Sequence, residues 1–208
     1  DMGGDNPIRI QSMTTTNTND TEACVAQAGR IIKAGGELVR LTTQGKREAE
    51  NLKNINAGIR ADGFSTPLVA DVHFNPNVAD VAALYAEKVR INPGNYVDPA
   101  RRFIKHEYTD AEYAEELQKI EDRFVPFLNI CKEHHTAIRI GVNHGSLSDR
   151  IRNRYGDTPE GIVESCMEFL RICKKQHFDN VVISIKSSNT VVMVRSVRLL
   201  VDTMNKED

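Results

Sequence analysis

The feature that most constrains this chain is a regular alternation of short β-branched runs with longer segments of helical period. The short runs predict strands at 7–13, 37–43, 67–74, 87–94, 137–143 and 180–188. The segments between and after them predict helices at 20–34, 45–61, 76–86, 111–134, 158–176 and 189–205. Repeated strand-then-helix order is typical of βα units around a parallel sheet. The sequence therefore predicts an α/β fold with about six βα units.

Residues at the ends of the predicted helices have the expected chemistry. Asp20 precedes a segment of helical period that stops at Gly35 and Gly36, a pattern typical of an N-cap and a C-terminal stop. Thr158 stands at an N-cap position with Pro159 at the first helical position. These caps support the strand–helix alternation at two separate places in the chain.

Two architectures accommodate about six βα units, an open doubly wound sheet and a barrel. The dinucleotide fingerprint G-x-G-x-x-G is missing after the first predicted strand, and the phosphate loop GxxxxGK[ST] is missing throughout. Polar residues instead follow the ends of all the strands, as in a barrel, where several strand ends hold one ligand. The sequence therefore favours a partial TIM (β/α)8-type barrel. A six-unit domain that is complete as it stands is the alternative.

Composition argues against several classes of partner. The net charge of -2 is not that of a general nucleic-acid binder, and no apolar run approaches the ~20 residues that cross a bilayer. Cys24, Cys131, Cys166 and Cys173 form no CxxC or other close metal-ligand spacing. We therefore expect reduced thiols, no metal site in these residues and a cytoplasmic protein. The chain does not begin with Met, which is consistent with removal of an upstream segment.

Basic residues recur inside the apolar strands. The set consists of Arg40, Arg90, Arg139 and Lys186. Burying an unpaired cation costs several kcal/mol, so repeated burial calls for a common partner. Alternate side chains of a barrel strand point inward, and those near the carboxyl ends line the mouth. The pattern therefore predicts a site for a multiply anionic ligand, because guanidinium groups match phosphate oxygens in pairs.

The alternative for any single arginine is an ion pair with a helix carboxylate on the outer face of the sheet. This interpretation is favoured for Arg9, in the first predicted strand. It is weaker for the four-cation set, because small polar residues follow each of its members. Gly94, Gly141 and Gly145 are among these followers, and we expect them to let backbone N–H groups approach an anion.

Other polar residues lie at predicted strand ends. Asp71 and His73 share strand parity and should face the same side, where they could orient hydroxyl groups, transfer protons or bind a divalent metal. A purely structural histidine is the alternative for His73. Asn143 and His144 open a glycine-rich turn, and for His144 both a role in the site and hydrogen bonding of the loop are open.

Five strings occur in order along the chain: GGDNPIRIQSMTT, PLVADVHFNP, VRINPGN, IRIGVNHGSLS and RYGDTPEGIVES. Together they resemble the 4-hydroxy-3-methylbut-2-enyl diphosphate synthases of the non-mevalonate isoprenoid pathway. The resemblance runs from Gly3 to the last predicted helix. Three further strings, TTQGKREAE, EYTDAEYAEELQKIEDRFVPF and NHGSLSDRI, resemble the long, three-domain form of the family.

The resemblance implies an iron–sulfur oxidoreductase that reductively opens 2-C-methyl-D-erythritol 2,4-cyclodiphosphate. Electrons would come from ferredoxin or flavodoxin through a [4Fe-4S] cluster held by a C-terminal domain, and a homodimer is compatible with it. Residues 1–208 would then be the N-terminal substrate-binding barrel domain, truncated before that cluster domain and the last two barrel strands. We expect these residues alone not to turn over substrate.

Seven positions match the family's substrate pocket, and none matches a catalytic residue or metal ligand. They are Arg40, Asp71, His73, Arg90, Arg139, Asn143 and Lys186. Arg9 is at no family-defining position. Two other functions stay open. One is a pterin-binding barrel similar to dihydropteroate synthase, whose signature after the first strand is missing here, and the other is a non-catalytic phosphate-binding module.

Overall fold

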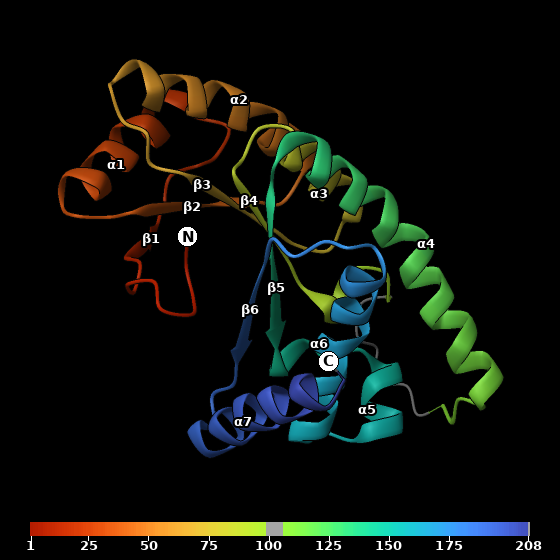
Figure 1. Ribbon diagram of the computed structural model, residues 1–208. Helices are drawn as coiled ribbons and strands as arrows, with labels where there is room; N and C mark the ends of the chain where they lie inside the picture. Colours follow the sequence, from red (N-terminus) through yellow and green to blue (C-terminus); the bar gives the residue numbers. More distant parts are fainter. Residues whose placement is uncertain (99–105, 208) are drawn as a thin grey trace.

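The computed structural model describes residues 1–98 and 106–207. In this part of the chain six strands form one parallel sheet in sequential order (Figure 1). The strands are β1 (Gln11–Met13), β2 (Leu38–Thr43), β3 (Leu68–Val72), β4 (Lys88–Ile91), β5 (Ala137–Asn143) and β6 (Val181–Lys186). Every strand therefore lies beside the one that precedes it in the sequence.

Helices connect the strands at the positions that the periodicity predicts. They are α1 (Thr21–Lys33), α2 (Lys46–Ala61), α3 (Pro76–Ala83), α4 (Asp110–His134), α6 (Pro159–Lys175) and α7 (Thr190–Glu207). Asp20 accepts a hydrogen bond from the Ala23 N–H, and Thr158 accepts one from the Gly161 N–H, so both predicted N-caps are confirmed. Thr109 and Glu112 add a reciprocal capping box at the start of α4.

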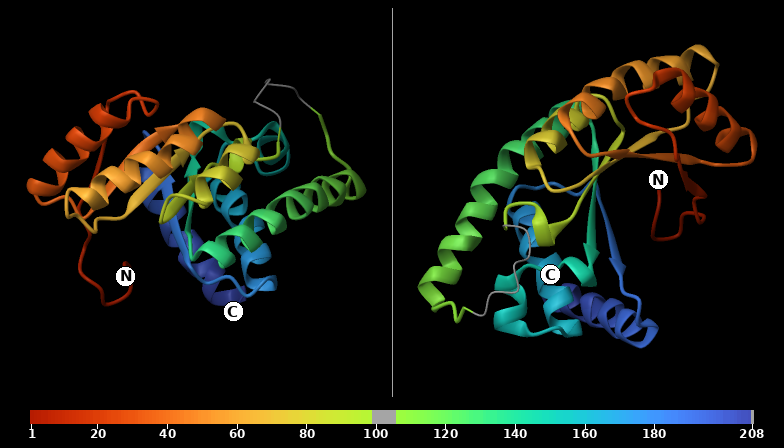
Figure 2. Two further views of the ribbon diagram at one scale, coloured as in Figure 1. Left: turned by 90° about the horizontal axis from the view of Figure 1, so that it is seen from above. Right: turned by 180° about the vertical axis from the view of Figure 1, so that it is seen from behind.

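The strand order decides between the two candidate architectures. A doubly wound sheet reverses direction at a switch point, whereas here each crossover steps to the next neighbour in the same direction. Because such crossovers are right-handed, this order places the helices on one face of a curved sheet (Figure 2). The prediction of a partial TIM-type barrel is confirmed.

The first strand is shorter than predicted, because its ladder is interrupted before Gln11. The carbonyl of Ile10 accepts the N–H groups of both Glu37 and Leu38, and the Ile10 N–H donates to the Glu37 carboxylate at 2.9 Å. Ile8 and Ile10 are consequently exposed, and residues 7–10 are not strand. Three short elements also lie outside the predictions: η1 (Pro93–Asn95), η2 (His144–Ser146) and α5 (Asp149–Tyr155).

Burial falls from the middle of the sheet towards its edges. Every residue of β3 and β4 is buried, whereas the residues of β6 are half-buried or exposed. Outside β6, helix α7 exposes a stripe formed by Val191, Val194, Val197 and Val201. Within the described ranges β1 and β6 each pair with only one strand, as expected for an arc of a barrel.

No helix in these ranges combines the length and the apolar character needed to cross a membrane.

Loops at the carboxyl ends of β4 and β5 are locked together. Asn92 Nδ2 donates to Ser146 Oγ at 2.8 Å, and a Cβ added to Gly94 would lie 1.9 Å from the Ser146 carbonyl oxygen. The buried Arg150 of α5 adds two pairs of hydrogen bonds. Its Nε and Nη2 donate to the Asp98 carboxylate, beyond η1, at 3.1 and 3.0 Å. Its Nη1 and Nη2 each donate to the Glu168 carboxylate of α6 at 2.7 Å. The mouth of the arc therefore has a rigid base.

We predict that Gly94→Ala destabilises the fold, because backbone rather than a flexible side chain occupies the space that the methyl group needs. The expected loss is about 1–3 kcal/mol of unfolding free energy, as for other overpacked sites. Gly145→Ala, in the facing loop, is the matched control, because its added Cβ would meet its nearest atom at 3.6 Å. Urea denaturation of the full-length variants measures the difference, and equal losses would contradict the packing argument.

Candidate anion-binding site at the strand ends

The sheet register brings the predicted residues into one row. Asp71 of β3, Arg90 of β4 and Arg139 of β5 are successive Cα partners, so their side chains leave the same face of the sheet. Arg40 projects from the neighbouring strand β2 and reaches the same carboxylate. The apolar residues on either side of each arginine are fully or almost fully buried. The predicted inward orientation of the three arginines is therefore consistent with the register.

Asp71 is the centre of the cluster. One carboxylate oxygen accepts from Arg90 Nη1 at 3.1 Å, and the other accepts from Arg40 Nη2 at 2.5 Å and lies 3.2 Å from His73 Nε2. Burial alone would raise the pKa of Asp71, but the His73 hydrogen bond and the charges of Arg40 and Arg90 lower it to about 2. The carboxylate therefore stays ionised. The prediction that Asp71 and His73 face the same side is confirmed.

Arg90 is also held from the next strand. Its Nη2 donates to the Gly141 carbonyl at 2.9 Å, and a Cβ on Gly141 would lie 2.5 Å from Arg90 Nε. Gly141 thus makes room for the guanidinium, as Gly94 makes room for the neighbouring loop. Both positions therefore require glycine because of packing. The predicted reason was different, namely that the glycine N–H groups approach an anion.

Arg139 adds positive charge that the cluster does not balance. Its Nε donates to Ser184 Oγ of β6 at 3.0 Å. Burial, followed by the nearby charges of Arg40 and Arg90, lowers the pKa of Arg139, while Asp71 opposes this shift. Like charges held together in a partly buried place favour any anion that neutralises them. Three guanidinium groups around one carboxylate therefore leave an excess of positive charge at this candidate site.

The remaining predicted residues lie at the rim. Asn143 and Lys186 are Cα partners at the last pair of the β5–β6 ladder. Asn143 Oδ1 accepts the Gly145 N–H at 3.2 Å, and the exposed Lys186 lies 3.4 Å from Ser188 Oγ. The contacts above unite Arg40, Asp71, His73 and Arg90 directly and Arg139 electrostatically, whereas Asn143 and Lys186 join the site through the register alone.

Arg9 lies at the opposite end of the strands. Its Nη1 pairs with Glu37 at 2.8 Å, and its Nε donates to the Asp1 carbonyl at 3.0 Å. A carboxylate does neutralise Arg9, as the ion-pair alternative expected, but it belongs to the turn before β2 and not to a helix.

Sequence reasoning missed a buried cation of β4, Lys88, and a hydroxyl group of β6, Ser184. Lys88 is 5% exposed, its Nζ lies 3.3 Å from Met2 Sδ, and burial followed by the charge of Arg139 lowers its pKa. The alternation Lys88–Val89–Arg90 carried the signal, since Lys88 and Arg90 share strand parity. Nothing local to Ser184 distinguishes it, because its role comes from pairing with β5.

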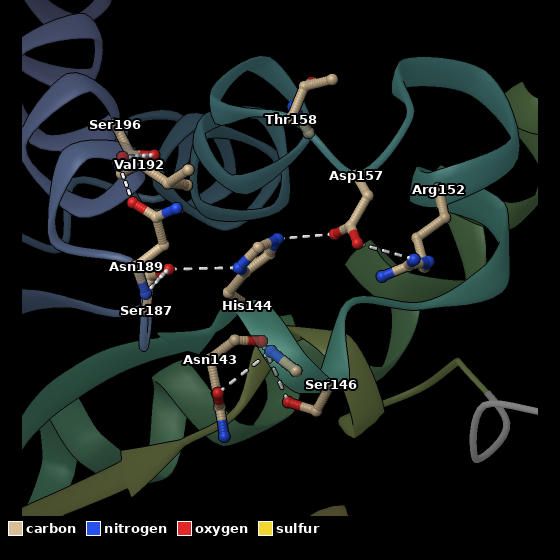
Figure 3. A network of polar contacts seen from close by, with 12 residues as sticks. Asn143, His144, Ser146, Arg152, Asp157, Thr158, Ser187, Asn189, Val192 and Ser196 are labelled. Atoms are coloured by element: carbon tan, nitrogen blue, oxygen red, sulfur yellow. Dashed lines mark hydrogen bonds and ion pairs between the residues drawn. The ribbon is translucent and has the colours of Figure 1, made fainter.

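His144 takes part in a side-chain network rather than in the arginine cluster. Its Nδ1 lies 3.1 Å from Ser187 Oγ, and its Nε2 lies 2.6 Å from Asp157 Oδ1 (Figure 3). The second oxygen of Asp157 accepts from Arg152 Nη2 at 2.8 Å. The loop-bonding interpretation of His144 is therefore the one that the structure supports.

The cysteines do not fit an iron–sulfur cluster. Cys131, Cys166 and Cys173 are buried, and burial raises the pKa of Cys166 and of Cys173 to about 12. A [4Fe-4S] cluster needs several thiolates that converge on one point. Residues 1–98 and 106–207 also contain no group of three or more His, Cys, Asp or Glu side chains placed to hold a metal ion.

We predict that Asp71 makes stability depend on acid pH. Its pKa lies below the usual 3.8, so the ionised carboxylate stabilises the fold above that value, and the stabilisation is lost as the pH falls towards 2. The shift corresponds to about 2 kcal/mol. Denaturation of full-length Asp71→Asn should show a deficit at about pH 5 that shrinks towards pH 2. The exposed Asp202→Asn is the control, and a deficit independent of pH would contradict the assignment.

Comparison with known proteins identifies the family. A model of the GcpE TIM-barrel domain matches residues 1–207. The 4-hydroxy-3-methylbut-2-en-1-yl diphosphate synthase (flavodoxin) of Phocaeicola vulgatus is 79% identical over 206 residues, which cover 99% of this chain and 34% of that protein. The protein of the same name from Parabacteroides distasonis is 69% identical over 207 residues, which cover 100% of this chain and 34% of that protein. The chain thus spans about a third of the length of these relatives.

Solved structures support the fold alone. β-Methylaspartase from Clostridium tetanomorphum superposes with a TM-score of 0.54 at 12% identity, covering 90% of this chain and 38% of that one. The 3-keto-D-glucoside 4-epimerase of E. coli gives a TM-score of 0.51 at 12% identity, covering 92% and 75%. The family match, in contrast, extends over almost all the residues and decides against the pterin-binding alternative. The chain belongs to the family of the GcpE TIM-barrel domain.

Proposed function

We propose that this chain is the substrate-binding part of a 4-hydroxy-3-methylbut-2-enyl diphosphate synthase. The substrate would be 2-C-methyl-D-erythritol 2,4-cyclodiphosphate, whose ring the whole enzyme opens reductively in isoprenoid biosynthesis. The observation that carries this proposal is the cluster of Arg40, Arg90 and Arg139 around one buried carboxylate, that of Asp71. A cyclic diphosphate has the multiple negative charge that this cluster leaves unbalanced. The names of the close relatives state a diphosphate, 4-hydroxy-3-methylbut-2-en-1-yl diphosphate, as the product of the reaction.

In this proposal Asp71 holds the guanidinium groups in place. Its carboxylate accepts one hydrogen bond from an Nη atom of Arg40 and one from an Nη atom of Arg90. Both guanidinium groups are therefore held at Asp71 before the ligand arrives. Preorganised donors do not lose side-chain entropy on binding, and a planar guanidinium can contact two phosphate oxygens at once. His73, which contacts the same Asp71 oxygen as Arg40, would position a substrate hydroxyl. Asn143 and Lys186 would contact the anion from the rim.

The electron-delivering part of the enzyme is proposed to lie outside these residues. Residues 1–208 would form the N-terminal barrel domain, and a [4Fe-4S] cluster would belong to the remaining two thirds of the protein. Two observations support this division: the chain spans 34% of its relatives, and residues 1–98 and 106–207 contain no group of side chains placed to hold a metal ion. Flavodoxin is the proposed electron donor because the relatives' names contain it. Ferredoxin, a homodimer and a bacterial cytoplasmic location remain expectations.

We predict that Arg139→Ala weakens binding of the cyclodiphosphate by the full-length protein roughly tenfold or more, since a lost bidentate contact costs ~1.5–3 kcal/mol. Titration calorimetry gives the Kd. Arg9→Ala is the matched control, because Arg9 also forms an ion pair but lies at the amino ends of the strands. Equal affinities of the wild type and Arg139→Ala would place the anion elsewhere.

A further inference from the structure

The ring of His144 joins two loops at the open edge of the arc. Ser187 follows β6, and Asp157 lies in the turn between α5 and α6 (Figure 3). We propose that His144 is a positioning residue that holds the β6–α7 loop, and through it Lys186, against the end of β5. Its consequence for ligand affinity rests on the proposed function, whereas its effect on the loop does not.

The contact lies directly beyond the last residue pair of the β5–β6 ladder. Asn143 and Lys186 are the last Cα partners of this ladder, and His144 and Ser187 are the residues that follow them. Strand parity places Asn143 and Lys186 on the inner face. Figure 3 shows the His144 side chain pointing away from that of Asn143. The His144–Ser187 bond therefore fixes the two strand ends from outside without occupying the mouth.

The Asp157 side of this network is rigid. Gly156 has a φ of +76°, in the left-handed region that favours glycine, and a Cβ on Gly161 would lie 2.7 Å from its carbonyl oxygen. Thr158 caps α6 and also donates to the Tyr155 carbonyl at 2.8 Å. Burial would raise the pKa of Asp157, but Arg152 and then His144 lower it, so the carboxylate remains an acceptor. This turn can therefore serve as the anchor for His144.

The Ser187 side of this network is the loop between β6 and α7. In the described part of the chain β6 pairs only with β5, and its last residue, Lys186, is exposed. Ser187 Oγ accepts the Asn189 N–H at 3.3 Å, and Asn189 Oδ1 accepts the N–H groups of Val191 and Val192 at the start of α7. A neutral His144 that donates from Nε2 to Asp157 accepts the Ser187 hydroxyl at Nδ1. Both ring nitrogens of His144 and the Ser187 hydroxyl then have partners, and the contacts run from the α5–α6 turn to the first turn of α7.

Two amide substitutions separate the two halves of the brace. His144→Asn keeps a polar atom near the position of Nδ1 and can still bond Ser187, whereas His144→Gln reaches towards Asp157 and gives up the Ser187 bond. Hydrogen–deuterium exchange of full-length protein without substrate should show faster exchange over 184–192 in His144→Gln and His144→Ala than in His144→Asn. Ser187→Ala removes the same bond from the other side and should reproduce the increase. His134→Ala, at an exposed histidine of α4, is the control.

Calorimetry with the cyclodiphosphate then tests the consequence at the site. Affinity should fall roughly fivefold in His144→Gln and Ser187→Ala, the effect of one lost hydrogen bond, and less in His144→Asn. Unchanged exchange over 184–192 in both His144→Ala and Ser187→Ala would overturn the proposal, as would equal exchange in the two amide variants. If the wild type failed to bind the cyclodiphosphate, the proposed function would fail, and the exchange result would still decide the role of His144.

Discussion

The buried ion cluster around Asp71 is the interaction on which the rest of the candidate site depends. One carboxylate draws guanidinium groups from β2 and β4 to the same point, and the imidazole of His73 approaches it from the end of β3. Without that charge, Arg40 and Arg90 would repel each other in a place that water hardly reaches. Gly141 belongs to the same arrangement, because any side chain there would displace Arg90. The cluster is therefore a framework for an anion as well as a source of charge.

A second set of contacts keeps the surrounding loops in a fixed relation. The β4 loop packs on the β5 loop through Gly94 and Ser146, and Arg150 joins both to α6 through two buried carboxylates. His144 continues this sequence of contacts to the loop after β6. The loops after β4, β5 and β6 therefore rest on one another, and a rigid mouth of this kind would bind a compact anion with little loss of conformational entropy.

The sequence predicted the regular elements well because their signals are local. A period of two or 3.6 residues, a cap three positions before a free N–H and a cation between apolar neighbours all involve residues close together in the chain. The same alternation placed Asp71 and His73 on one side and the arginines on one face. The strand prediction was wrong at residues 7–10, because the Glu37 side chain interrupts pairing with β2 there. The short elements η1, η2 and α5 were not predicted.

The sequence by itself determined the α/β alternation, most of the strand and helix bounds and the set of cations that could bind an anion. Only the tertiary structure decided which of these groups meet. Asp71 and Arg90 are 19 residues apart, His144 and Ser187 are 43 apart, and Arg150 and Asp98 are 52 apart. Their pairing depends on which strand ends lie side by side, and this follows from the strand order and register of the whole sheet. Such long-range partners leave no periodic trace in the sequence.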